Sequence, residues 1–204
     1  MFGVADYGAF VAAILIFLAI PGPGNLALIT STSKGGIAGG IGATLGIIAG
    51  DQVLMWAAVA GLATVLLASP ALFGAVQWAG AAYLAWMGLR MLLAKPGAKP
   101  VLDIQPRHYF RQAAFITLLN PKAIVFYMAF FPLFVDPGRH PSLATFGVMA
   151  ATIAVLTFAY GLAAVLLTHF LAERMRANPA IGRVLGKFAG LCLIGFGVKL
   201  AVSR

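Results

Sequence analysis

Two ionisable residues of opposite charge lie deep inside apolar stretches of this sequence. Asp51 falls near the middle of an apolar run over about residues 37–67, and Lys122 lies near the midpoint of a run over about 113–135. A charge at the centre of a membrane helix costs roughly 2.5–3.5 kcal/mol on insertion scales, so each group should face protein or water and find a partner. The carboxylate suits a proton, an amine or a lysine, and the ammonium suits a carboxylate.

These two charges have a structural interpretation and a functional one. Asp51 and Lys122 are the two charged residues placed at membrane depth, and an ion pair that serves structure alone is one alternative. An amino-acid zwitterion carries the same two charges as the pair. A bound zwitterion could therefore replace the contact between Asp51 and Lys122, and this replacement would couple ligand binding to a conformational change.

A proline-glycine motif, Pro21-Gly22-Pro23-Gly24, interrupts the first apolar run just before Asn25. Prolines two residues apart remove amide donors and clash with preceding carbonyls, and glycine loosens the backbone further. The motif predicts a broken or kinked helix, whose freed carbonyls need partners within protein or beside a watery cavity. A half-helix beginning near Asn25 would direct free amides and a positive dipole end at a carboxylate. A plain proline kink is the alternative.

A second interruption, Asn120-Pro121-Lys122, lies in the fourth apolar run. Three spans separate it from the first interruption, so the two halves of the chain would have opposite orientation. Interrupted helices at corresponding positions of inverted repeats indicate the binding site in many transporters.

The elements that must position these residues follow from composition. Of 204 residues, 62% are hydrophobic and 9% charged, against roughly 25% charged in an average soluble domain. This composition excludes a soluble globular chain and a disordered one. A transmembrane helix needs about 20 apolar residues, and six runs can be marked: about 9–33, 37–67, 72–93, 113–135, 143–171 and 184–202.

We therefore expect an all-α membrane protein with six transmembrane helices arranged as two inverted three-helix repeats. Helices 1 and 4 should be broken at the two proline motifs. The chain would form a single integral-membrane domain over 1–204, with repeat 1 at about 1–93, a cytoplasmic loop at about 94–111 and repeat 2 at about 112–204. Gly42 and Gly46 share a helix face with Gly50 at a spacing of four, which lets a neighbouring backbone approach closely.

The net charge of +9 predicts orientation, not nucleic-acid binding, because most basic residues lie in short linkers. Ten of the fourteen lysines and arginines lie in or beside the odd-numbered linkers: Lys34, Arg90, Lys95, Lys99, Arg107, Arg111, Arg174, Arg176, Arg183 and Lys187. Three lie on the other side: Arg139, Lys199 and Arg204. The positive-inside rule then predicts a multi-pass protein of the bacterial inner membrane with both termini periplasmic.

Other chemistry finds little support in the sequence. The single cysteine, Cys192, excludes an internal disulfide and a cysteine-based metal site. The three histidines have no metal-ligand spacing, and no nucleophile elbow or phosphate-binding loop occurs. We expect no enzyme, no catalytic residue, no metal and no cofactor.

Taken together, these motifs resemble the LysE/RhtB family of bacterial amino-acid exporters. The resemblance covers nearly the whole chain and rests on three stretches: residues 18–25, the glycines from Gly35 to Gly50 with Asp51, and residues 119–127 with 131–134. It implies ATP-independent efflux of amino acids or close derivatives from the cytoplasm. By match to the family motifs, the functional positions are Pro21, Gly22, Pro23, Asn25, Gly46, Asp51, Asn120, Pro121 and Lys122.

The expected function is secondary-active export of a small amino acid by alternating access, coupled to protons or to the membrane potential, for example by antiport. Expected partners are the amino-acid substrate and membrane lipid, and the four-spaced glycines suit a homodimer. The alternatives are an inorganic cation exporter, a membrane enzyme and a non-transporting membrane subunit. The sequence leaves open the substrate, the coupling ion and stoichiometry, and whether Asp51 and Lys122 pair directly or each bind substrate.

Overall fold

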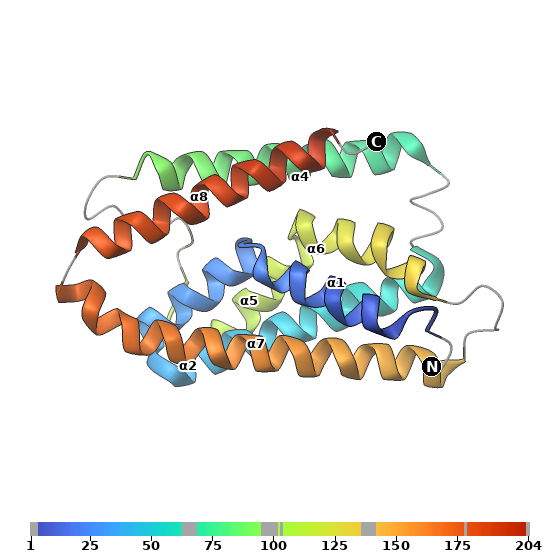
Figure 1. Cartoon of the computed structure of the whole chain (residues 1–204), viewed down its shortest axis with the longest axis horizontal. Coiled ribbons are helices and arrows are strands. Elements are labelled where there is room, and N and C mark those ends of the chain that lie inside the picture. The colour runs from blue at the N-terminus through green and yellow to red at the C-terminus, as the bar shows by residue number, and fades with distance from the viewer. Residues whose placement is uncertain are drawn as a thin grey trace.

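The chain is almost entirely helical in the computed structural model, which describes residues 4–62, 69–94, 102, 104–135, 142–177 and 179–202 (Figure 1). Its first helices are α1 (Tyr7–Ala19) and α2 (Pro23–Ala57), followed by a π-helical turn η1 (Ala58–Leu62). The end of the expected second run, residues 63–67, lies outside the described residues. So do Lys95, Lys99, Arg139 and Arg204 from the orientation argument.

Helical geometry stops between α1 and α2. Helix α1 begins at its N-cap Asp6, whose carboxylate accepts a hydrogen bond from the amide of Ala9 at 2.9 Å. It ends at Ala19, because Ile20 has extended geometry with ψ 117°. Gly22 is also extended, and Pro23 occupies the first turn of α2, where a missing amide costs nothing. The chain therefore crosses the proline-glycine motif as a short non-helical link.

Helix α2 turns back on itself at Gly36. This residue has φ 62°, a left-handed conformation that glycine adopts without a Cβ clash. In Figure 1 the chain runs in one direction up to this turn and returns beside itself afterwards. The first limb of α2 thus continues α1 beyond the link, and the second limb, which carries Asp51, forms the next antiparallel element.

The fourth apolar run forms several short helices. They are α5 (Tyr109–Leu118), α6 (Pro121–Val125), the π-helical η2 (Phe126–Phe130) and the 3-10 helix η3 (Phe131–Phe134). Helix α5 begins within the last three residues of the segment expected as a loop over about 94–111. The reason is packing, since Tyr109 and Phe110 lie against the glycine face of α2.

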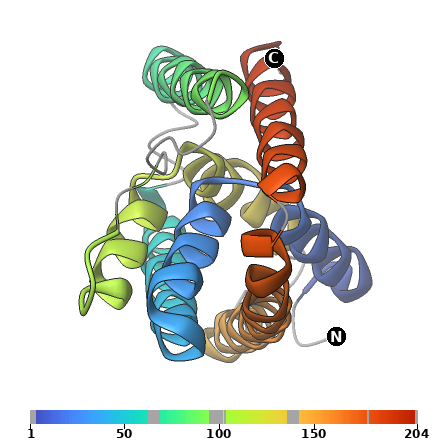
Figure 2. The same cartoon turned by 90° about the vertical axis from the view of Figure 1, so that its left-hand side faces the viewer.

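Three long helices complete the described chain: α4 (Pro70–Leu92), α7 (Leu143–Ala177) and α8 (Pro179–Val202). Figures 1 and 2 show α4 and α8 side by side as an upper layer over the other helices. Within that pair the backbones approach closely at glycines, since a Cβ on Gly88 would lie 2.6 Å from the Gly190 carbonyl oxygen. The lower helices share a core that includes Phe10, Met55 and Tyr127.

The N-terminal segment is joined to the end of η3. Val4 forms an antiparallel bridge with Val135, and the Ala5 amide donates to the Phe134 carbonyl at 3.0 Å. The Tyr7 hydroxyl also lies 2.9 Å from the Thr152 hydroxyl of α7. In Figure 1, α1 begins and α8 ends toward the same end of the molecule.

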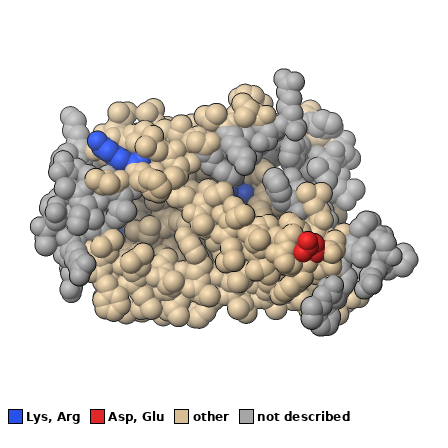
Figure 3. All heavy atoms as spheres, viewed as in Figure 1, with Lys and Arg blue, Asp and Glu red and all other residues tan. Residues whose placement is uncertain are grey.

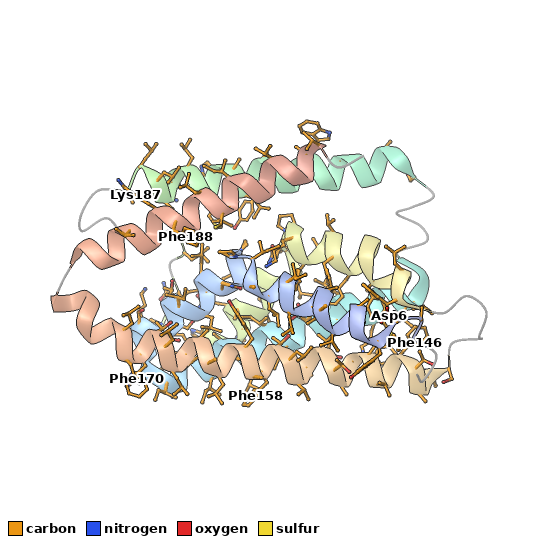
Figure 4. All side chains as sticks on the ribbon, in the orientation of Figure 1. Asp6, Phe146, Phe158, Phe170, Lys187 and Phe188 are labelled. Atoms are coloured by element: carbon orange, nitrogen blue, oxygen red, sulfur yellow. The ribbon has the colours of Figure 1, made fainter. Side chains whose placement is uncertain are left out.

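The outer surface of the described chain is strongly apolar. Figure 4 shows Phe158 and Phe170 on the side of α7 that faces away from the other helices, and Phe170 is 69% exposed. The face in Figure 3 carries few charged atoms. Exposed apolar surface of this extent marks a membrane or interaction surface.

Two helical segments of the described chain are long and apolar enough to cross a bilayer, by length and composition. They are Leu143–Leu171, with 29 residues, and Pro23–Gly61, with 39 residues. A straight helix of the second length would extend about 58 Å, whereas the hydrocarbon core is about 30 Å thick. The turn at Gly36 resolves this excess by dividing the segment into two limbs.

Candidate functional site

Lys122 is the centre of the candidate site, and it is buried, with 3% of its surface exposed. Asn120 caps α6 by accepting a hydrogen bond from the Lys122 amide at 3.1 Å, and Pro121 fills the first turn. This cap fixes the start of α6 and directs Lys122 toward α1. Its ammonium donates to the carbonyls of Phe17 and Ile20, each at 2.6 Å.

The link between α1 and α2 is built around this ammonium. The last carbonyls of a helix have no intrahelical partner, and in an apolar interior each needs another donor. Lys122 supplies that donor for two of them, and its Nζ also lies 4.3 Å from the ring centroid of Phe17. A Cβ on Gly22 would be 3.3 Å from Lys122 Cδ and 3.4 Å from Nζ. Glycine at this position therefore leaves room for the charged group.

Asn25 closes the other side of the link. Its side-chain amide donates to the Leu18 carbonyl at 3.1 Å and to the Tyr160 hydroxyl of α7 at 2.8 Å. One side chain from the first turn of α2 thus binds the end of α1 and a third helix. Three carbonyls at the end of α1, those of Phe17, Leu18 and Ile20, are hydrogen-bonded by side chains.

Asp51 lies on the second limb of α2 and is also buried, at 2% exposure. The Tyr127 hydroxyl donates a hydrogen bond to its carboxylate, and Lys122 interacts with it through charge. The hydrogen bonds of the Lys122 ammonium itself go to the α1 carbonyls. Asp51 and Lys122 are therefore electrostatic neighbours that each have separate hydrogen-bond partners.

Thr117 places a buried hydroxyl next to the same link. The residue is 2% exposed, and its Oγ1 has no hydrogen-bond partner. A Cβ on Gly24, in the first turn of α2, would lie 3.9 Å from this Oγ1, and a Cβ on Gly50 would lie 2.7 Å from Thr117 Cβ. The hydroxyl thus adjoins the amino-terminal end of α2, where backbone amides lack intrahelical acceptors.

The arrangement suits a small ligand with separate positive and negative ends. It combines one ammonium, one carboxylate, carbonyl oxygens at the end of α1, and amides and a hydroxyl at the start of α2. The described residues contain no cluster of three or more His, Cys, Asp or Glu side chains able to hold a metal ion.

Comparison with known proteins finds a family match over most of the chain. A model of the LysE type translocator family matches residues 15–204. The chain belongs to this family. A leucine efflux protein of Salmonella typhimurium and another of Klebsiella pneumoniae are each 30% identical to it over 207 residues, covering 100% of this chain and 98% of theirs. An uncharacterized membrane protein of Pseudomonas aeruginosa is 34% identical over 212 residues, covering 98% and 97%. No solved structure matches the chain.

Membership in the LysE type translocator family, together with the apolar helices, makes the chain a membrane protein. The structure brings most of the sequence-predicted positions of this translocator into one region. Gly22, Asn25, Asn120, Pro121 and Lys122 lie at the link, and Asp51 adjoins it through Lys122 and Tyr127.

Gly46 has a different environment. A Cβ at this position would collide with the carbonyl oxygen of Phe110 in α5, and would lie 3.1 Å from Ala113 Cβ. Its neighbours are thus backbone and side-chain atoms of α5, as expected from the four-spaced glycines. This close approach holds α2 near α5, the helix that carries Thr117.

Four residues of the site were missed by the sequence reasoning. Phe17, Thr117 and Tyr160 lie in apolar runs without a distinguishing pattern, although Tyr160 is the single tyrosine of the run over 143–171. Tyr127 lies in an aromatic stretch after the second proline motif, and such a stretch is more typical of a lipid or core contact than of a substrate site. Its place on a π-helical turn, a feature that is frequent at functional sites, becomes visible only in the structure, so the sequence alone offered no signal for it.

Proposed function

We propose that this LysE-family chain is a secondary-active exporter of a neutral amino acid across the bacterial inner membrane. One observation carries the proposal: the buried Lys122 ammonium binds the end of α1 and lies beside Asp51. The curated relatives in Salmonella and Klebsiella are named leucine efflux proteins, which supports an amino acid as the substrate.

A bound zwitterion can replace the contacts that the residues of the site make with one another. The substrate carboxylate would bind the Lys122 ammonium, the Thr117 hydroxyl and the amides of the first turn of α2. The carbonyls of Phe17 and Ile20, which lose the lysine, would then accept hydrogen bonds from the substrate ammonium, with Asp51 nearby. The Phe17 and Ile20 carbonyls keep a donor in both states and the Thr117 hydroxyl gains a partner, so the exchange avoids a large desolvation cost.

Conformational coupling follows from where these groups lie along the chain. The α1 carbonyls belong to the first half, whereas Lys122 and Tyr127 belong to the second. We propose two inverted three-helix repeats, broken at the two proline motifs, that rock against each other around the site. Substrate binding would weaken the Lys122 contact between the halves and permit the movement, because a ligand shifts an equilibrium only through differential contacts.

Asp51 is the candidate for the coupling group. A carboxylate buried at membrane depth and held by a tyrosine hydroxyl can take up and release a proton when the site opens to water. The proposed coupling is to protons or to the membrane potential, without ATP.

The proposal is tested by reconstituting the purified chain into liposomes loaded with labelled leucine, alanine and glutamate. We expect efflux of the neutral amino acids under an imposed proton gradient or membrane potential. Asp51→Asn should reduce efflux to the level of empty liposomes. Asp6→Asn is the matched control, because Asp6 is exposed and asparagine caps a helix about as well as aspartate.

If Asp51→Asn exports at the wild-type rate, the site assignment is wrong. If the wild-type chain moves no amino acid under any gradient, the exporter proposal is wrong and a non-transporting subunit is favoured. An inorganic cation exporter would need several clustered oxygen ligands, and Asp51 is the one buried carboxylate among the described residues. Cation counter-flow assays on the same liposomes test that alternative directly.

A further inference from the structure

An apolar groove lies between α1 and α8, and the first residues of the link, Ile20 and Pro21, form part of its wall. Its cavity volume is about 510 Å³, within the range of roughly 300–1,000 Å³ typical of small-molecule pockets. One wall is the end of α1 and the other is α8, and the lining includes Ile16, Ile20, Pro21, Phe188, Cys192 and Gly195. Figure 4 shows Phe188 on the part of α8 nearest the lower helices.

The groove exists because α8 uses a different face to pack against α4. Gly190 and Gly197 contact α4 backbone, with the Gly197 Cβ position 3.0 Å from the Ala81 carbonyl oxygen. Phe188, Cys192 and Gly195 follow one another at the spacing of a second helical face. A Cβ on Gly195 would meet nothing within 4 Å, so this glycine leaves the middle of the groove open.

The groove adjoins the group that would anchor a substrate. Ile20 lines it, and the carbonyl oxygen of the same residue is 2.6 Å from the Lys122 ammonium. Pro21, also in the wall, begins the link that leads to Gly22 beside the lysine. A ligand whose polar end binds the Lys122 ammonium would therefore have an apolar space beside it, because Ile20 contacts both the ammonium and the groove.

We propose that this groove receives the aliphatic side chain of the exported amino acid and selects for large apolar side chains over small ones. The inference rests on the proposed function, which supplies the zwitterionic end. Phe188, Cys192 and Gly195 are the specificity-determining residues on α8, with Ile16 and Ile20 opposite. The polar contacts are common to all amino acids, so leucine and alanine would differ only in the contacts that their side chains make in the groove.

The first test fills the groove. Gly195→Leu places four carbons in the open space, and Gly186→Leu is the matched control, since a Cβ on Gly186 also meets nothing within 4 Å and this residue is not part of the groove. In proteoliposomes, Gly195→Leu should lower the ratio of leucine to alanine efflux by about tenfold or more, as for an apolar pocket that loses room for a side chain. Gly186→Leu should leave the ratio unchanged.

The second test needs no variant, because Cys192 is the chain's single cysteine and lines the groove. A water-soluble maleimide should modify Cys192 in the reconstituted wild-type chain, since thiol modification proceeds through the solvated thiolate. Saturating leucine should slow that modification severalfold, and alanine at equal occupancy should slow it much less.

The two tests separate this inference from the proposed function. Wild-type export of both amino acids, with an unchanged leucine-to-alanine ratio in Gly195→Leu and no protection of Cys192, overturns the groove assignment and leaves the exporter proposal standing. Absence of any export overturns the proposed function itself. Reaction of Cys192 with a lipid-soluble maleimide but not with the water-soluble one means that an acyl chain occupies the groove, which also overturns the inference.

Discussion

At the scale of single residues, Lys122 replaces the hydrogen bonds that a helix end normally makes to water. Two carbonyls at the end of α1 accept from its ammonium, and the Phe17 ring covers it. Burying an ammonium is costly unless it is paired and hydrogen-bonded. The Phe17 and Ile20 carbonyls and the Asp51 charge together meet that condition, so each group makes the burial of the others tolerable.

This dependence predicts the effect of removing the charge alone. Lys122→Met keeps an unbranched side chain but leaves the carbonyls of Phe17 and Ile20 without a donor, at about 1–3 kcal/mol for each unpaired group. We expect a lower midpoint of thermal unfolding in detergent, followed by tryptophan fluorescence, together with loss of export.

Lys187→Met is the control for the thermal measurement, because Lys187 is exposed on α8 (Figure 4). Equal unfolding midpoints for Lys122→Met and wild type would contradict the bonding described for Lys122.

The sequence could identify the charged and proline-linked residues of the site, because charge and backbone breaks at membrane depth are conspicuous. It could not identify Tyr160 or Thr117, whose roles depend on distant neighbours. The partner of Tyr160 is Asn25, 135 positions away. The hydroxyl of Thr117 belongs to the site only because the fold places it beside Gly24. Long-range proximity of this kind leaves no local pattern in an apolar run.

At the scale of elements, spacing predicted a close helix approach on the face of Gly42, Gly46 and Gly50, and the structure supplies its partner, α5. The three glycines face Tyr109, Phe110, Ala113 and Thr117 along that helix. Spacing alone could not name the partner, since several runs have small residues. It also could not place the sharp turn at Gly36, because the sequence there contains two consecutive glycines.

Gly46→Ala tests this packing. Its methyl group would collide with the Phe110 carbonyl oxygen, and relief by backbone movement typically costs about 1–3 kcal/mol. We expect a lower unfolding midpoint and slower export, because Thr117 moves with α5.

Gly147→Ala on α7 is the matched control, since a Cβ there meets nothing within 4 Å. It should be neutral or stabilise by about 0.5–1 kcal/mol through helix propensity. A Gly46→Ala variant as stable as Gly147→Ala would show that the two helices have room to separate.

At the scale of the whole molecule, the basic residues predict that the loop over 94–111 faces the cytoplasm and both termini face the periplasm. The start of α1 and the end of α8 lie toward the same end of the molecule in Figure 1, which supports an even number of crossings. The count of six spans and the inverted repeat stay predictions.

Fusion reporters test this orientation. Alkaline phosphatase attached at the C-terminus should be active and green fluorescent protein attached there should be dark, because each folds on one side of the membrane only. The same reporters inserted near residue 98 should give the opposite pattern. An active C-terminal fluorescent fusion would contradict the predicted orientation.

Because both halves of the chain contribute residues to the site, the site is incomplete while the chain is being synthesised. Asp51 enters the bilayer in the second limb of α2, long before the ribosome has made Tyr127 and Lys122, its two partners in the folded chain. During that interval the carboxylate is held at a depth that costs roughly 2.5–3.5 kcal/mol for an unpartnered charge. We therefore expect the amino-terminal half to stay incompletely stabilised until the remaining helices have been inserted.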